Sequence, residues 1–176
     1  TIFELVVEGN RNYTVRITDI QPIVSCQSPL NGTLFFSPSG GADTSTQLFL
    51  DLDNPHAVPS FITKDQNGTI TSGKDFFGTH TVSLRQGEQF TFKVVASTTK
   101  HFCKFTLAMT VLDGDKTVTE TVTNNGQPFQ VTATLHFSAY QVLYIGGGDA
   151  IAFPKTNSFG DVMWARANPN TYAYGS

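Results

Sequence analysis

Two carboxylates and an amide stand close together where a predicted strand ends, at Asp51, Asp53 and Asn54. Alternate residues of a strand project to the same side, so Asp51 and Asp53 could share a hard cation such as Ca²⁺ with Asn54 and backbone oxygens. The same residues, placed just before Pro55, also suit Asx turns at a solvated strand end. The sequence therefore offers a calcium site or a strand-end turn, and it predicts no other cofactor.

A cysteine and a histidine stand two residues apart at His101 and Cys103, so they share one face of a strand. A Cys–His nucleophile needs an exposed thiol with a lowered pKa, whereas Cys103 begins a run of alternating core residues. Cys26, the second of the two cysteines, also points inward by alternation. We expect an inter-strand disulfide between Cys26 and Cys103, with two buried free thiols as the alternative. An even cysteine count in a sheet protein agrees with an oxidising compartment.

The short motifs of common enzyme classes are missing from the sequence, including the nucleophile elbow, the zinc-protease helix and the P-loop. Gly146-Gly147-Gly148 follows a strand, but no helix pattern follows it to supply the dipole that binds phosphate. A hydrolase would need a carboxylate pair such as Asp51 and Asp53 to converge in a cleft. We expect that the chain is not an enzyme.

Three Asn-x-Thr sequons begin at Asn12, Asn31 and Asn67. All of them fall in turn-like segments, so the sequence predicts accessible glycosylation sites if the host is eukaryotic. A chain rich in Asn and Thr also produces such tripeptides by chance.

Aromatic residues outside the alternating runs are the remaining hint of function. Phe76 and Phe77 lie in a predicted loop, and Trp164 and Tyr172 lie near the C-terminus. Rings in such places either form a protein-binding or sugar-binding face or fold back as a minor core.

Composition limits the classes of partner. The 176 residues suit one domain, and the net charge is −3 with 14% charged residues. Basic residues are scattered singly, so we expect no nucleic-acid binding. No apolar run reaches the roughly 18 residues of a transmembrane helix, so we expect no membrane insertion by this segment. A chain that starts at Thr1 in place of Met is expected to be a processed or excised fragment.

Alternating apolar and polar residues dominate the chain, most clearly at Gln89–Val122. Three such runs, with a tight turn at Asp113-Gly114-Asp115, predict a three-strand antiparallel meander with one apolar face. Pro22 inside an earlier run predicts an edge strand or a bulge. Phe61–Phe77, which is polar and rich in glycine, is expected to be a long irregular connection with at most a short strand.

Together these runs predict an all-β fold, an antiparallel β-sandwich of Ig-like or jelly-roll type with about 9–11 strands. We expect one sandwich domain at residues 1–152 and an irregular tail at 153–176 packed on it. The inward face of the meander, at Cys103, is expected to meet the Cys26 strand in the opposite sheet.

Two long segments resemble a known group of proteins. They are PLNGTLFFSPSGGADTSTQLFLDLDNP from Pro29 and FTFKVVASTTKHFCKFTLAMTVLDGDKTVTETVTNNGQPFQVTA from Phe90. Their PL-x-GT strand, DLD strand end, DG hairpin and NGQPF turn resemble the extracytoplasmic β domain of uncharacterised actinobacterial single-pass membrane proteins. That family has no established activity, so the resemblance implies an extracytoplasmic location and a β fold.

These observations predict a non-enzymatic extracytoplasmic β-sandwich domain, secreted or membrane-anchored, that acts in protein or ligand binding. A protein or a surface glycan is the expected partner. The alternative is a self-assembling structural subunit, such as a capsid or appendage jelly roll, which forms homo-oligomers through its edge strands. A site is expected in the loops that the strands support or in the aromatic tail.

Overall fold

The computed structural model of the chain describes residues 1–36, 47–64, 66, 70–146 and 164–173. Contacts divide the chain into two compact units, which we name unit 1 (Thr1–Ser28 and Thr44–Ala133) and unit 2 (Pro29–Asp43 and Thr134–Ser176). This division differs from the one expected at residue 152, because Pro29–Asp43 groups with the C-terminal part of the chain. Within the described residues, no helix is long and apolar enough to span a membrane.

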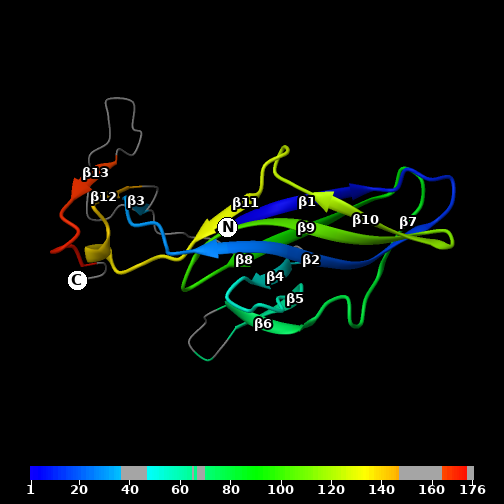
Figure 1. The fold of residues 1–176 in the computed structure, drawn as a ribbon, viewed down its shortest axis with the longest axis horizontal. Helices are drawn as coiled ribbons and strands as arrows, with labels where there is room; N and C mark the ends of the chain where they lie inside the picture. The colour runs from blue at the N-terminus through cyan, green and yellow to red at the C-terminus, as the bar shows by residue number, and fades with distance from the viewer. Residues whose placement is uncertain (37–46, 65, 67–69, 147–163, 174–176) are drawn as a thin grey trace. The chain divides into compact units, whose positions relative to one another are not determined.

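Unit 1 is built from two sheets (Figure 1). The first has the order β1-β8-β4-β5-β6, with bounds β1 (Ile2–Glu8), β8 (Gln89–Ser97), β4 (Gln47–Asp51), β5 (Ser60–Lys64) and β6 (Ile70–Asp75). The second has the order β10-β9-β2-β7 with β11 also on β9, and its bounds are β10 (Lys116–Val122), β9 (Phe102–Asp113), β2 (Val15–Gln27), β7 (Val82–Leu84) and β11 (Phe129–Thr132). Strand pairs are antiparallel except for β4 with β8, which run parallel.

One hydrophobic core joins the two sheets of unit 1. The first sheet contributes Phe92 and Val94, and the second contributes Phe105 and Leu107, all of them at most 2% exposed. These are alternate residues of β8 and β9, so the period of two seen in the sequence is the pattern of the buried face. The all-β sandwich is therefore confirmed.

The ladder between β2 and β9 is the longest in the second sheet, and Figure 1 shows the two strands side by side. Cys26 pairs with Cys103 in this ladder, and their sulfurs form a disulfide of 2.03 Å. The predicted pairing is confirmed, but the predicted link between opposite sheets is wrong, because both cysteines belong to one sheet. Cys103 is fully buried, whereas Cys26, near the end of β2, is exposed, so its predicted inward burial is also wrong.

Pro22 lies on an edge, as predicted. β2 pairs with β9 along one edge. Along its other edge β7 pairs only with Val15–Ile17, and no described strand pairs with the rest of that edge. A bulge also occurs, between Ile17 and Asp19, where the register with β9 shifts. A proline is tolerated here because its missing N–H removes no bond from a sheet interior.

The predicted meander is only partly correct. β9 and β10 form the expected hairpin, with Asp113 opposite Lys116 and Gly114 at a φ of 62°, where a side chain would be strained. β8, however, lies in the first sheet beside β1 and β4, so the chain crosses from one sheet to the other between Ser97 and Phe102. Alternation identifies a strand with one buried face but does not identify its neighbour.

The expected irregular stretch Phe61–Phe77 contains most of β5 and the whole of β6, and these two strands are paired. β6 alternates only between exposed and half-buried residues, which leaves no apolar period in the sequence. At Gly73 an added Cβ would come within 2.7 Å of the Phe61 carbonyl oxygen, so this glycine permits a close approach of the two backbones.

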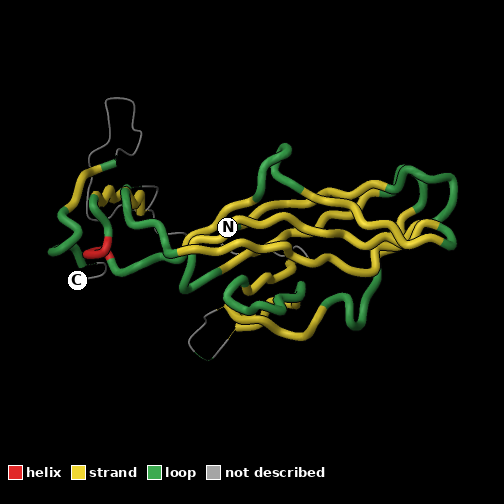
Figure 2. The backbone as a smooth tube through the Cα atoms, in the orientation of Figure 1, coloured by secondary structure: helices red, strands yellow, loops and turns green. Residues whose placement is uncertain are grey.

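Unit 2 contains a three-stranded sheet of the order β13-β12-β3, with bounds β13 (Ala165–Ala167), β12 (Val142–Ile145) and β3 (Thr33–Phe36). β12 pairs parallel to β3 and antiparallel to β13. A single 3-10 turn, η1 (Phe137–Ala139), precedes β12 and is red in Figure 2. Leu143 and Ile145 are buried on one side of this sheet. The predicted irregular tail thus includes a strand, and its residues 153–163 lie outside the described part of the chain.

Candidate functional site

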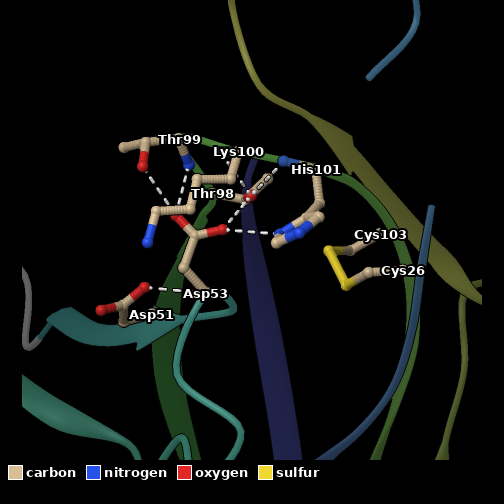
Figure 3. A network of polar contacts seen from close by, with 8 residues as sticks. All are labelled: Cys26, Asp51, Asp53, Thr98, Thr99, Lys100, His101 and Cys103. Atoms are coloured by element: carbon tan, nitrogen blue, oxygen red, sulfur yellow. Dashed lines mark hydrogen bonds and ion pairs between the residues drawn. A yellow bond between two sulfur atoms is a disulfide. The ribbon is translucent and has the colours of Figure 1, made fainter. Parts of the chain in front are cut away.

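A single carboxylate, Asp53, holds the turn between β8 and β9. Its Oδ1 accepts hydrogen bonds from Oγ1 of Thr98 at 2.6 Å and from Nδ1 of His101 at 3.1 Å. Its Oδ2 accepts from the backbone N–H and from Oγ1 of Thr99, both at 2.7 Å. Figure 3 shows the carboxylate against the 98–101 turn. Since the Asp53 side chain is only 10% exposed, these bonds are partly sheltered from water.

Thr98 extends the same network. Its Oγ1, while donating to Asp53, accepts the backbone N–H groups of Lys100 at 3.3 Å and His101 at 3.1 Å. The turn between the two sheets is therefore fixed by side chains where no strand ladder can satisfy its backbone. The arrangement positions His101, the residue just before β9 and two residues before Cys103.

The protonation of Asp53 follows from these contacts. Partial burial raises the pKa of its carboxyl, but hydrogen bonds from Thr98, Thr99 and His101 lower it by more, so the pKa lies well below its usual value of 3.8. Asp53 is therefore ionised across the physiological range and serves as an acceptor for its neighbours.

Asp53→Asn is expected to lower the free energy of unfolding by about 1–3 kcal/mol at pH 7, because an amide N–H₂ would then face donor groups. The pKa of Asp53 is lower in the folded chain than its usual 3.8, so this stabilisation is present above about pH 4 and declines as the pH falls below it. Urea unfolding at pH 7 and at pH 2.5 measures the change, with Asp115→Asn, an exposed hairpin carboxylate, as the matched control. An equal cost for Asp53→Asn at both pH values would contradict the role of the charge.

The strand-end turn, one of the two predictions for this segment, is confirmed. Oδ1 of Asp51 accepts the N–H of Asp53 at 3.1 Å, and Oδ1 of Asn54 accepts the N–H of His56 at 2.9 Å. Both are Asx-type bonds from a side chain to the backbone two residues later. The described residues contain no group of three or more His, Cys, Asp and Glu side chains suited to a metal ion. Calcium binding at Asp51 and Asp53 stays a prediction.

A groove of about 540 Å³ lies beside the Asp53 network. It is lined by β2, by the segment after β4 and by the residue just before β9: Gln21, Pro22, Val24, Cys26, Leu52, Asp53, Asn54, Pro55, His56, Ala57, Val58 and His101. Figure 3 places the disulfide beyond the imidazole of His101. Because Cys103 is bonded to Cys26 and His101 to Asp53, His101 and Cys103 do not form a nucleophilic pair.

The sheet of unit 2 carries three aromatic side chains on the side opposite its buried residues. Phe35 of β3 stacks on Tyr144 of β12, with ring centroids 5.0 Å apart and planes 8° apart. Trp164 meets Phe35 edge to face at 5.3 Å. Phe35 is 57% exposed and Trp164 is 44% exposed. We call Phe35, Tyr144 and Trp164 the aromatic face.

Gly146 lets the indole of Trp164 pack directly against the backbone. An added Cβ at Gly146 would lie 2.7 Å and 2.9 Å from Cε3 and Cδ2 of the indole. Only a residue without a side chain allows the ring to lie so close to the backbone. One part of the indole is therefore fixed on the strand, while the rest stays open to solvent.

The other predicted aromatic residues fold back. Phe76 is 5% exposed and Phe77 packs against the core of unit 1. Tyr172 is half-buried and meets Phe137 edge to face at 5.1 Å. Of the four rings selected from the sequence, Trp164 is the one that is exposed, at 44%.

Two of the predicted sequons lie on described segments. Asn12 is exposed in the turn between β1 and β2, and Asn31 is exposed just before β3. Asn67 lies outside the described residues. Accessibility of Asn12 and Asn31 is as expected, and their modification stays a prediction.

The sequence interpretation missed Phe35 and Tyr144 as site residues. Alternation contained the signal: if Phe36 and Leu143 point inward, then Phe35 and Tyr144 point outward. What alternation could not show is that these two segments, more than a hundred residues apart, pair in parallel.

No protein-family model, no curated protein and no solved structure matches this chain. The resemblance to extracytoplasmic domains of actinobacterial membrane proteins stays a prediction.

Proposed function

We propose that this chain is a non-enzymatic binding domain that works outside the cytoplasm and binds carbohydrate on its aromatic face. The carrying observation is that Phe35 and Trp164 are about half exposed while the opposite side of the same sheet, at Leu143 and Ile145, is buried. Exposing large rings in place of burying them forgoes hydrophobic stabilisation, and aromatic residues in contiguous exposed patches mark binding surfaces.

Carbohydrate suits this face better than a protein partner. The C–H side of a pyranose ring is flat and apolar and packs on an aromatic ring, while its hydroxyl groups need hydrogen-bond partners. The stacked pair of Phe35 and Tyr144 offers a flat contact of this kind, and Trp164, held by Gly146, borders it. Just after β13, Asn168 is exposed and offers its amide N–H₂ as a hydrogen-bond donor, while its Oδ1 accepts the N–H of Asn170.

The disulfide supports the extracytoplasmic location. Cys26 and Cys103 are bonded, and Cys26 is exposed to solvent. Exposed disulfides persist in oxidising compartments and are rare in the cytosol of most organisms.

A self-assembling subunit is the second candidate, favoured by one observation. The side of β2 opposite β9 has no described strand partner from Thr18 onward, and Ile23 on this strand is 61% exposed. Pro22 in the middle of that edge opposes strand addition, because it cannot donate a bond to an incoming strand. Multi-angle light scattering separates the candidates, since the subunit requires a closed ring, shell or fibre and the binding domain does not.

Trp164 makes the binding test direct, because it is the only tryptophan of the chain. Titration with soluble polysaccharides, neutral and uronate-containing, is expected to change its intrinsic fluorescence when a sugar packs on the face. Phe35→Ala is expected to weaken the binding about 10-fold, equal to ~1.4 kcal/mol, through loss of the stacking surface. Affinity gel electrophoresis gives a second readout. It is needed for Trp164→Ala, because this variant lacks the tryptophan whose fluorescence is measured.

Ile23→Ala is the matched control, because it removes exposed apolar surface from unit 1 and leaves the aromatic face intact. Equal binding by wild type, Ile23→Ala and Phe35→Ala would show that the sugar binds elsewhere. No response to any polysaccharide, in fluorescence or in migration, would overturn the proposed function.

A further inference from the structure

Arg166 brings a positive charge to the side of the sheet that carries the aromatic face. It is directly opposite Tyr144 in the β12–β13 ladder, and directly paired residues project to the same side of a sheet. Tyr144 in turn pairs with Phe35 of β3. The three strands thus present a phenyl ring, a phenol ring and a guanidinium in one row across the sheet.

The charge of Arg166 is not neutralised within the described structure. Arg166 is exposed and is the only Asp, Glu, Lys or Arg among the described residues of unit 2. It forms no ion pair with any residue that the structure describes; the described ion pairs join Arg11 to Asp113 and His101 to Asp53. A guanidinium is always charged and carries five donors, so it is available to an anion from outside.

A polar cavity opens beside this arginine. It has a volume of about 460 Å³, within the range of small-ligand sites, and is lined by Gln141, Val142, Arg166, Ala167, Asn168, Pro169 and Asn170. Oδ1 of Asn168 accepts the backbone N–H of Asn170 at 3.0 Å, which leaves the Asn168 amide N–H₂ as a donor. Three residues with amide side chains, Gln141, Asn168 and Asn170, therefore line this hollow at the end of the sheet together with Arg166.

We infer that the sugar bound by the aromatic face is acidic: a pyranose that carries a carboxylate, with the carboxylate held by Arg166 and hydroxyl groups held by the amides of the cavity. The planar guanidinium fork matches a carboxylate with two parallel hydrogen bonds. Amides supply the mixed donors and acceptors that hydroxyl groups require. This inference rests on the proposed function and specifies its ligand class.

Uronate polymers and their methyl esters test the inference, because esterification removes the charge and keeps the sugar backbone. Polygalacturonate, alginate and hyaluronate, each as the free acid and as the methyl ester, are titrated against the full chain with Trp164 fluorescence and calorimetry as readouts. At least one free acid is expected to bind about 10-fold or more tightly than its ester, a difference that shrinks as salt is raised.

Arg166→Gln is expected to remove the preference for the free acid, by weakening binding of the acid until it resembles binding of the ester. Arg166→Lys keeps the charge but loses the fork, so an intermediate preference is expected. Arg85→Gln, an exposed arginine of unit 1, makes the same change in net charge and is expected to bind as wild type does. Thermal unfolding of each variant confirms that unit 2 is folded.

The outcomes separate the two levels of the proposal. Equal binding of acid and ester, with a Trp164 response to both, would overturn the acidic-sugar inference and leave carbohydrate binding intact. Dextran sulfate that binds as tightly as the best uronate, with the same loss in Arg166→Gln, would overturn the assignment to a carboxylate. Binding of a neutral polysaccharide alone would overturn the acidic-sugar inference, and no response to any polysaccharide, neutral or acidic, would overturn both.

Discussion

Removal of the Cys26–Cys103 disulfide is expected to lower the free energy of unfolding of unit 1 by about 4–5 kcal/mol. The bond closes a loop with a sequence separation of 77 residues, and loop-closure entropy in the unfolded chain sets this magnitude. Cys26→Ser with Cys103→Ala is the suitable double variant, because Cys26 is exposed and Cys103 is fully buried. A serine in place of Cys103 would add the cost of burying a hydroxyl.

Urea and thermal unfolding, with and without dithiothreitol, measure this effect. The melting temperature of the double variant is expected to fall by roughly 15–20 °C, and the wild type with reductant is expected to approach it. The reductant should not change the double variant, which serves as the control for any other action of the reagent. Two alkylatable thiols in the native, unreduced wild type would contradict the presence of the bond.

The disulfide also shows what sequence patterns can and cannot specify. Pairing of the only two cysteines follows from their count and from the sheet fold. Their place in one sheet does not follow, because it depends on β2 and β9 being neighbours in the ladder. Alternation reports the buried side of each strand separately, and the choice of neighbour is made by long-range packing. For the same reason β8 was expected beside β9 and is found in the other sheet.

The candidate sites follow the same rule. Asp53 was selected because of its neighbour Asp51, but its partners are Thr98, Thr99 and His101, about 45 residues later in the chain. Local spacing could identify the carboxylate, and only the crossing between the two sheets of unit 1 brings it to that turn. Hydrogen-bond donors, which the sequence could not place, then decide its protonation.

The aromatic face depends even more on long-range pairing. Phe35, Tyr144 and Arg166 come from three separate segments, and each is an ordinary outward residue of a short strand. Trp164 was selected for its position outside the alternating runs, yet its fixed orientation depends on Gly146. A pattern search along one segment cannot detect a row of side chains that forms across strands.

Leu143→Ala and Phe35→Ala are expected to differ sharply in stability, although both residues lie in neighbouring, directly paired strands of unit 2. Leu143 is fully buried, so its truncation leaves a cavity and is expected to cost about 2–5 kcal/mol. Phe35 is 57% exposed, so its truncation is expected to cost no more than about 1.5 kcal/mol, the value of its contact with Tyr144.

Denaturant unfolding followed by circular dichroism, together with the fluorescence of Trp164 as a probe inside unit 2, measures both variants in the same unit. The comparison decides what kind of surface the aromatic face is. If Phe35→Ala costs as much as Leu143→Ala, the ring is part of a core, and its exposure is no longer evidence for binding. If Phe35→Ala leaves the free energy of unfolding nearly unchanged and weakens sugar binding about 10-fold, the ring contributes mainly to ligand contact. A contribution to stability would then not explain why the ring lies on an open face of the sheet.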